Sequence, residues 1–305
     1  KEENGEKHFI IPDACCVINP HQPGETYPFK EICGAMVAYK TILALKKRID
    51  EASENDGLHV IPDDLTDTFL DLAAFATIGD VMPLIDENRI IVKEGLKRIK
   101  NTKNKGLSAL IRECQLDKEN ISAYHVGFVL GPCFNAAGRL ESVDPAINLL
   151  AAQTEAEADK YAAKLRNLNE SRKTLTEEGT EKAMAIIESS ELINDKIILA
   201  AVPDTHESIA GIIAGRLREK YNKPCLVFTK TETCYKGSGR SIPAYHMHEG
   251  LTKCKEHILA YGGHSQAAGL SVAFDELDKL RAELNAGCTL TEEDFALNVK
   301  IDVPM

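Results

Sequence analysis

The sequence of 305 residues has no apolar run of about twenty residues, the length that a helix needs to span a bilayer. Its first residues, Lys1–Lys7, are too polar for a secretory signal peptide. These two absences argue against an integral membrane protein and against a secreted one. We therefore expect a soluble cytoplasmic protein with no membrane partner.

Cysteine pairs at metal-binding spacing are also missing. The nine cysteines are scattered along the chain, and no two of them form a C-x-x-C pair. An odd number of unpaired cysteines predicts reduced thiols in a cytoplasm. Cys15 and Cys16 are adjacent, so in a short strand over 15–18 we expect one of them to be buried and the other exposed.

A surplus of basic residues, which is typical of proteins that bind nucleic acid through its phosphates, is absent as well. The chain has 36 Lys and Arg against 47 Asp and Glu, a net charge of −11. Composition alone therefore argues against DNA. Local clusters can still bind phosphate, because charge is screened over about 8 Å at physiological salt. One basic run extends over 93–105, and a solvated helix face is the alternative interpretation of it.

The spacing of apolar residues predicts a helical first half and an alternating second half. In the first half we expect helices over 29–52, 66–76, 90–99 and 106–114, and another that Asp144 caps. Residues 154–190 are rich in Ala, Glu, Lys, Leu and Arg, which predicts one long helix or two abutting ones. In the second half we expect strands over 196–202, 225–228 and 270–274, and a strand or loop punctuated by glycine over 235–242. Helices are expected over 208–221 and around 248–254. This alternation is typical of an α/β layer.

Residues Gly262–Gly269 (GGHSQAAG) combine glycines, an imidazole and small side chains. Glycine lets the main chain approach an anion closely, and a helix that begins near Ser265 would direct free N–H groups at the same point. His264 could donate to a phosphate oxygen or move a proton. We therefore expect a phosphate site at Gly262, Gly263 and His264. A glycine turn with a surface histidine is the alternative.

Ser238 and Arg240 lie two positions apart in a segment punctuated by glycine. If the segment is extended, both side chains point to one face. A hydroxyl and a guanidinium on one face could hold a terminal phosphate.

Five motifs follow one another along the chain, and together they carry a resemblance to a known family. They are Ala76–Leu84 (ATIGDVMPL), Gly131–Leu140 (GPCFNAAGRL), His206–Arg216 (HESIAGIIAGR), Gly237–Pro243 (GSGRSIP) and Gly262–Gly269. From about Pro12 onward the sequence resembles the DHH/DHHA1 phosphoesterases, and among them the exonucleases that degrade single-stranded DNA from its 5′ end. The GPCFNAAGRL string is the most specific of the five, because other DHH phosphoesterases do not generally carry it.

The resemblance implies an α/β protein with a defined order of domains. Residues 1–150 would be the remainder of a parallel-sheet DHH catalytic domain, and 151–190 a long connecting helix. Residues 191–290 would be a smaller α/β DHHA1 substrate-binding domain, and 291–305 the start of a following domain. The residues implied to bind nucleic acid are Arg139, Ser238, Arg240, Gly262, Gly263 and His264, with His264 also catalytic.

The resemblance also implies a divalent cation, manganese or magnesium, with Asp80 as a ligand. The remaining acidic ligands and the D-H-H triplet of the family do not occur in the sequence. Two-metal hydrolysis needs several carboxylates, so we expect this chain to be a fragment that is inactive alone. Without the resemblance, a lone aspartate after a helix is usually a cap or a turn former.

The implied function is hydrolysis of single-stranded DNA in DNA repair and recombination, with a single-stranded-DNA-binding protein as a further partner. Two alternatives stay open. One is a noncatalytic module that binds phosphate or nucleic acid, and the other is a DHH phosphodiesterase that acts on short oligonucleotides or cyclic dinucleotides. For Arg139, the alternative to a nucleic-acid contact is tight interdomain packing with an acid such as Glu141 as its partner.

Overall fold

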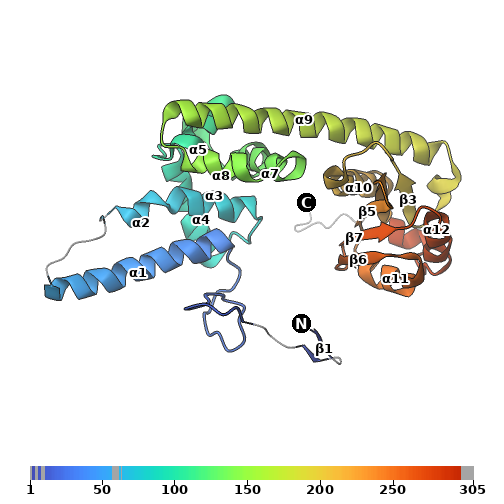
Figure 1. Cartoon of the computed structure of the whole chain (residues 1–305), viewed down its shortest axis with the longest axis horizontal. Helices are drawn as coiled ribbons and strands as arrows, with labels where there is room; N and C mark the ends of the chain where they lie inside the picture. The colour runs from blue at the N-terminus through green and yellow to red at the C-terminus, as the bar shows by residue number, and fades with distance from the viewer. Residues whose placement is uncertain (1, 4–5, 8–10, 57–61, 63, 297–305) are drawn as a thin grey trace, which may run out of the picture. The chain divides into compact units, whose positions relative to one another are not determined.

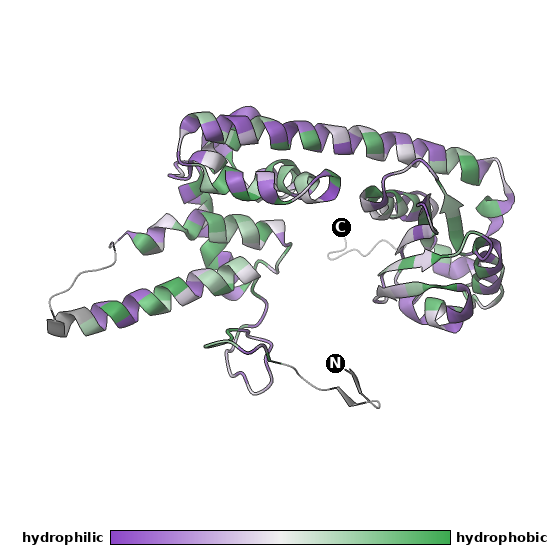
Figure 2. Cartoon of the chain, in the orientation of Figure 1, coloured by the Kyte–Doolittle hydropathy of each residue, from purple (hydrophilic) through white to green (hydrophobic). Residues whose placement is uncertain are grey.

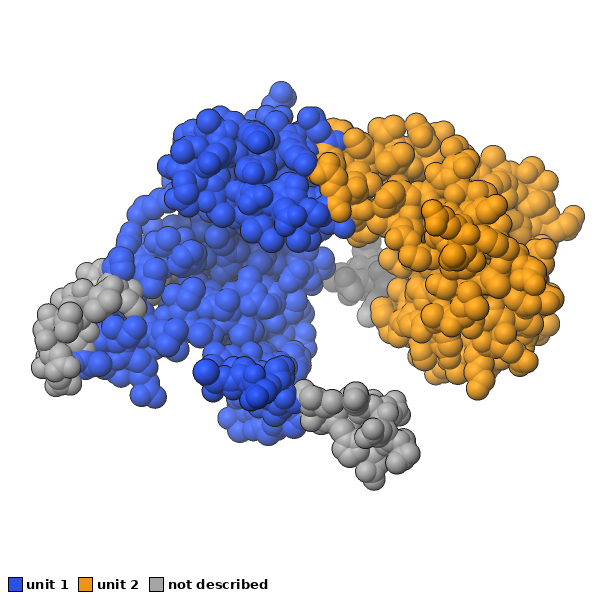
Figure 3. Space-filling model, in the orientation of Figure 1, with its two compact units in different colours: residues 1–138, 142–167 blue, residues 139–141, 168–305 orange. Residues whose placement is uncertain are grey.

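The computed structural model describes residues 2–3, 6–7, 11–56, 62 and 64–296. Contacts divide the chain into two compact units (Figure 3). Unit 1 comprises residues 1–138 and 142–167, and unit 2 comprises residues 139–141 and 168–305. Among the described residues, every helix is too short or too polar to cross a membrane. Residues 297–305, most of the segment expected to begin a following domain, lie outside the described part.

Unit 1 is helical, apart from a two-stranded antiparallel ribbon of β1 (Glu2–Glu3) and β2 (Glu6–Lys7). Its helices confirm the segments that apolar spacing predicts (Figure 1). They are α1 (Gly34–Asp56), α2 (Leu65–Thr68), α3 (Leu70–Gly79), α4 (Asp86–Ile99), α5 (Lys105–Glu113), the 3₁₀ turn η1 (Lys118–Asn120), α6 (Ala123–His125), the π-helix η2 (Val126–Leu130), α7 (Gly131–Leu140) and α8 (Asp144–Ala151). The parallel sheet that the resemblance implies for this part is not found among its described residues.

Two local predictions in unit 1 are wrong. Residues 15–18 are irregular rather than a strand, and both Cys15 and Cys16 are exposed. Because these residues do not pair with another strand, there is no sheet face against which either thiol could be buried. Helix α8 is capped by Val143, and Asp144 is its first residue, next to the proline of the first turn. An acidic side chain there still favours the helix N-terminus electrostatically.

The long helix is one continuous element, α9 (Glu155–Glu188), which confirms the simpler of the two predictions. It runs from unit 1 into unit 2 and is 34 residues long. Figure 2 shows hydrophilic and hydrophobic residues interspersed along its length. The 3₁₀ turn η3 (Glu191–Asn194) follows and leads the chain into the sheet of unit 2.

Unit 2 is built on a five-stranded sheet in the order β3-β4-β5-β7-β6. The strands are β3 (Ile198–Ala201), β4 (Cys225–Lys230), β5 (Tyr235–Arg240), β6 (Ala260–Gly263) and β7 (Ala267–Val272). Only β3 and β4 run parallel, and α10 (Glu207–Tyr221) makes the crossover that such a pair requires. The other helical elements are α11 (Met247–Lys253), the 3₁₀ turn η4 (Lys255–His257), α12 (Leu277–Ala286) and the 3₁₀ turn η5 (Glu292–Phe295). This mixed architecture confirms the α/β fold class.

The sheet separates two hydrophobic cores. On one face, Ile198 and Val227 pack with residues of α9 and α10 such as Leu217. On the other face, Phe228 and Leu270 lie in a core that reaches residues of α11 and α12. The sheet is therefore covered by α9 and α10 on one side and by α11 and α12 on the other, which leaves the residues of its outer strands to form a surface.

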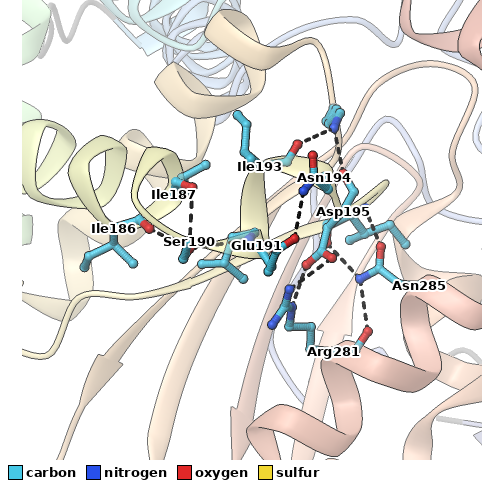
Figure 4. Close-up of polar contacts among 12 residues, drawn as sticks. Ile186, Ile187, Ser190, Glu191, Ile193, Asn194, Asp195, Arg281 and Asn285 are labelled. Atoms are coloured by element: carbon cyan, nitrogen blue, oxygen red, sulfur yellow. Dashed lines mark hydrogen bonds and ion pairs between the residues drawn. The ribbon is translucent and has the colours of Figure 1, made fainter.

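Polar contacts fix α12 to the chain that enters β3 (Figure 4). Arg281 donates through two nitrogens to the carboxylate of Asp195, over 2.6 and 3.1 Å. The side-chain amide of Asn285 accepts from the N–H of Ile197 and donates to the carbonyl of the same residue, both over 3.0 Å. A bidentate arginine contact is directional. These contacts fix the position of α12 relative to β3, which is the edge strand opposite the glycine-rich edge strand β6.

Candidate functional site

One face of β5 carries Lys236, Ser238 and Arg240, because alternate residues of a strand share a face. Arg240 Nη1 donates to Ser238 Oγ over 3.4 Å and to the Gly239 carbonyl over 2.8 Å. The prediction that Ser238 and Arg240 point the same way is therefore confirmed. Both side chains are half-buried, which restricts their motion.

Glycines continue this face across the two outer strands. Ser238 pairs with Gly269 of β7, which in turn pairs with Gly262 of β6, and residues directly opposite each other share a face. A Cβ at Gly262 or at Gly269 would have no atom within 4 Å. The sheet beside Ser238 is thus bare backbone, and a ligand can approach it without meeting a side chain.

A hollow of about 510 Å³ lies over this bare part of the sheet. Its lining includes Ser238, Gly269 and Ser271 of the sheet, and Ser208 from the first turn of α10. The dipole of α10 favours an anion at this end of the helix. The N–H groups of Ser208 and Ile209 already donate to the imidazole and the carbonyl of His206, over 3.3 and 3.0 Å. The hollow therefore combines a helix N-terminus, hydroxyls and exposed main chain.

Two guanidinium groups occur on this side of unit 2. Arg139 groups with unit 2, and its Nη1 donates to the carbonyl oxygen of Ser208 over 2.9 Å. Burial, and second the positive charge of Arg139, lower the pKa of Arg240. Among the described residues, the hydrogen-bond partners of the two guanidiniums are a hydroxyl and backbone carbonyls rather than carboxylates. Two like charges without an acid between them favour an anionic ligand.

An ion pair stands at the rim of the same hollow. Lys236 Nζ lies 2.7 Å from a carboxylate oxygen of Glu207, the first residue of α10. Both side chains are about half exposed, so this contact contributes little to stability. It does neutralise Lys236, which leaves Arg139 and Arg240 as the cations of the site that have no acidic partner among the described residues.

The glycine motif folds differently from the prediction. Gly262 and Gly263 end β6, and after a turn at His264–Gln266 the chain returns as β7, so no helix begins near Ser265. The backbone N–H of His264 donates to the Ala267 carbonyl over 2.8 Å and is not free for an anion. Gly263 has a φ of 149°, and a Cβ there would lie 2.3 Å from the Ala267 carbonyl oxygen. The second glycine is needed to close the hairpin.

His264 lies in the hairpin turn, at the end of β7 where Ala267 pairs with Arg240. Its imidazole is exposed, and Nδ1 accepts a hydrogen bond from the N–H of Gln266 over 3.2 Å. With Nδ1 acting as an acceptor, Nε2 is the nitrogen that carries a proton in the neutral ring. The structure therefore brings His264 and Arg240 to one end of the strand pair.

Asp80 is the C-terminal cap of α3, where its backbone N–H donates to the Ala76 carbonyl over 2.9 Å. Its carboxylate is exposed, and within the described part of the chain no three His, Cys, Asp or Glu residues are placed to hold a metal ion. One carboxylate does not make a two-metal site. The described residues therefore do not fit the cation that the resemblance implies.

The small residues of GPCFNAAGRL have a packing role. The string forms the whole of α7, and Ala136 and Ala137 are fully buried in it. The two alanines therefore offer no surface to a nucleic-acid strand, because their side chains face the protein interior. Only Asn135, Gly138 and Arg139 of this helix are exposed.

Three of the six basic residues in the run over 93–105 are paired with acids. Lys97 pairs with Glu94 over 2.8 Å, and Lys103 pairs with Asp64 over 3.0 Å. Arg98 pairs with Asp67 over 2.8 Å. A solvated and paired helix surface accounts for this run better than a phosphate-binding one.

Comparisons with known proteins identify a known domain in this part of the chain. Residues 194–289, which contain the sheet and its hollow, match the DHHA1 domain family. The chain is 37% identical over 297 residues to "Single-stranded-DNA-specific exonuclease RecJ" of Bacillus subtilis, covering 96% of this chain and 36% of the relative. It is 33% identical to the RecJ of Escherichia coli, covering 87% of this chain and 48% of the relative.

Solved structures give the same result. RecJ of Thermus thermophilus in complex with Mg²⁺ aligns with a TM-score of 0.72 at 31% identity, covering 86% of this chain and 38% of that one. An exonuclease RecJ bound to manganese aligns with a TM-score of 0.71 at 32% identity, covering 87% of this chain and 63% of that one.

The chain therefore contains a DHHA1 domain over residues 194–289. The proteins that it resembles over most of its own length are RecJ exonucleases. It spans less than half the length of the two curated relatives described above, 36% and 48%.

Proposed function

We propose that this chain is the part of a RecJ-type single-stranded-DNA exonuclease that holds the 5′ phosphate of the strand. The observation that carries the proposal is the pair Arg139 and Arg240, which have no acidic partner among the described residues and stand beside a bare glycine surface. Ser238 adds a hydroxyl donor, and Gly262 and Gly269 let the end of the strand lie against the main chain.

Electrostatics favour a terminal phosphate over an internal one. A phosphomonoester carries a charge of about −1.5 to −2 at pH 7, and three of its oxygens accept hydrogen bonds. A phosphodiester carries a single charge. Two guanidiniums with a hydroxyl are therefore matched best by a phosphate at the end of a strand, whereas the net charge of −11 disfavours nonspecific binding along it.

We propose that His264 contacts the same phosphate through Nε2, where it donates a hydrogen bond or a proton to a phosphate oxygen. Its support is its place in the hairpin turn, at the end of β7 that pairs with Arg240. Asp80 is proposed as one ligand of the family's manganese or magnesium. Because the described residues do not complete such a site, we assign no step of the reaction to the cation in this chain.

The proposal extends to the setting of the reaction. It comprises hydrolysis of single-stranded DNA in DNA repair and recombination, in the cytoplasm, with a single-stranded-DNA-binding protein as a partner. A noncatalytic module that binds phosphate or nucleic acid is the second candidate. One observation favours it, namely that no three metal-ligating side chains come together in the described part of the chain.

The proposal predicts that the chain distinguishes the chemical state of the 5′ end. A hydrogen bond to a charged group contributes about 1.5–3 kcal/mol, and 1.4 kcal/mol corresponds to about a tenfold change in affinity. A short single strand with a 5′ phosphate should therefore bind at least about tenfold more tightly than the same strand with a 5′ hydroxyl. Fluorescence anisotropy at fixed salt measures both affinities.

A strand with a 3′ phosphate and a 5′ hydroxyl is the control for charge alone. It carries the same total charge as the 5′-phosphorylated strand, and we expect it to bind like the strand without a terminal phosphate. If all three strands bind equally, the site does not recognise a 5′ phosphate.

A further inference from the structure

We propose that Gly211 is the positioning residue that sets the locations of the Ser238 hydroxyl and the Arg240 guanidinium. The inference rests on the proposed function and concerns how the same site is built. Helix α10 packs against β5 (Figure 1), on the face that carries these two side chains. Gly211 is the buried position of α10 that lies directly over them.

The distances show how little room there is. A Cβ at Gly211 would lie 2.7 Å from Ser238 Oγ, 2.9 Å from Arg240 Nη2 and 3.4 Å from Arg240 Cζ. Two carbon atoms in contact are normally about 3.5–4.0 Å apart. The two atoms proposed to bind the phosphate thus fill the space that any other residue at position 211 would need for its side chain.

The atoms that a methyl group would meet are the ends of side chains rather than backbone. A guanidinium and a hydroxyl can rotate away, so α10 and β5 need not separate. A Cβ at Gly179 in α9 would also meet the end of a side chain, Cδ1 of Ile213 at 2.6 Å, but that side chain is fully buried in a hydrophobic core. We therefore infer that Gly179 serves packing, whereas Gly211 holds the phosphate-binding atoms in place.

Helix α10 offers a matched control four residues further on. A Cβ at Gly215 would have Arg240 Cγ as its nearest neighbour, at 3.9 Å, which is ordinary contact. Glycine-to-alanine changes at the two positions therefore alter helix propensity in the same way. They differ in whether the new methyl group displaces the atoms of the site.

The test compares Gly211→Ala and Gly215→Ala in the 305-residue chain, with the 5′-phosphate and 5′-hydroxyl strands as probes. We expect Gly211→Ala to reduce the ratio of the two affinities about tenfold. Gly215→Ala should leave the ratio within about twofold, and thermal unfolding should occur at a similar temperature in both variants. Retention of the wild-type ratio by a folded Gly211→Ala protein would overturn the inference.

A second pair of variants covers the case in which Gly211→Ala does not fold. Alanine at position 238 has no Oγ and lysine at position 240 has no Nη2. Gly211→Ala should therefore fold when combined with Ser238→Ala and Arg240→Lys, and should then bind both strands as the Ser238→Ala/Arg240→Lys variant does. Failure of the triple variant to fold, when the double variant folds, would mean that Gly211 serves general packing. If the wild-type chain itself shows no 5′-phosphate preference, it is the proposed function that fails.

Discussion

Replacing Arg240 with alanine is expected to weaken binding of a 5′-phosphorylated single strand about tenfold or more. The guanidinium is half-buried and is held by the Gly239 carbonyl and the Ser238 hydroxyl, so its hydrogen bonds to a phosphate are preorganised. The loss of one charge-assisted hydrogen bond costs about 1.5–3 kcal/mol. Titration of labelled strands against both proteins at one salt concentration measures the change.

Two comparisons separate this effect from a general loss of positive charge. Binding of the 5′-hydroxyl strand should change much less, because the partner of Arg240 is missing from it. Arg218→Ala removes the same charge from a partly buried position of α10, where Arg218 contacts Glu219 over 3.1 Å, and should leave both affinities within about twofold. An equal loss for the two strands in Arg240→Ala would reduce Arg240 to nonspecific charge.

The 305-residue chain is expected to release no nucleotides from a 5′-phosphorylated single strand in the presence of manganese. Hydrolysis by two cations requires several carboxylates to hold them about 3.5–4 Å apart. Of the ligands that the resemblance implies, the sequence contains only Asp80, which is proposed as a ligand, and it has no D-H-H triplet. Chromatography of the products after a long incubation measures the reaction, and turnover comparable to that of an intact RecJ would contradict this expectation.

A complementation experiment identifies the role of Asp80. Joining the chain to a segment that bears D-x-D and D-H-H should give a manganese-dependent nuclease. Asp80→Ala in that protein should then lower the rate by at least about 100-fold, since even residues that only support metal ligands contribute about 10- to 100-fold. Activity that survives the substitution would remove Asp80 from the metal site.

Local patterns predicted much of the fold. Apolar spacing located α3, α4, α5 and α10 to within a few residues. The buried face of a helix is formed by residues three or four positions apart, so a short stretch of sequence is enough to predict it. The period-two alternation of a strand likewise predicted that Ser238 and Arg240 share a face. In both cases the deciding interactions lie within one element.

The predictions that failed depend on residues far apart in the sequence. Residues 264–269 contain two alanines and no β-branched residue, so their composition does not indicate a strand. Residues 267–269 nevertheless begin β7, because they pair with β5, where Arg240 is opposite Ala267 and Ser238 is opposite Gly269. Tertiary pairing overrides weak local preference in this way.

The roles of the small residues could not be predicted either, because they also depend on contacts between distant parts of the sequence. Ala136 and Ala137 are buried within a helix whose neighbours the sequence does not identify. The HESIAGIIAGR motif contains Gly211, but only the structure shows which side chains of β5 lie beneath it. The role proposed for Gly211 depends on the atoms that lie next to it, and these belong to β5 rather than to its own helix.

The central claim is that Arg139, Ser238 and Arg240 form the receptor for a 5′ phosphate. A crystal structure of the chain with a 5′-phosphorylated oligonucleotide tests it most directly. We predict that the terminal phosphate lies within hydrogen-bonding distance of both guanidiniums and of Ser238 Oγ, with the first nucleotide over Gly262 and Gly269. A well-ordered strand whose 5′ phosphate lies elsewhere, with the hollow over β5 filled by solvent, would contradict the claim.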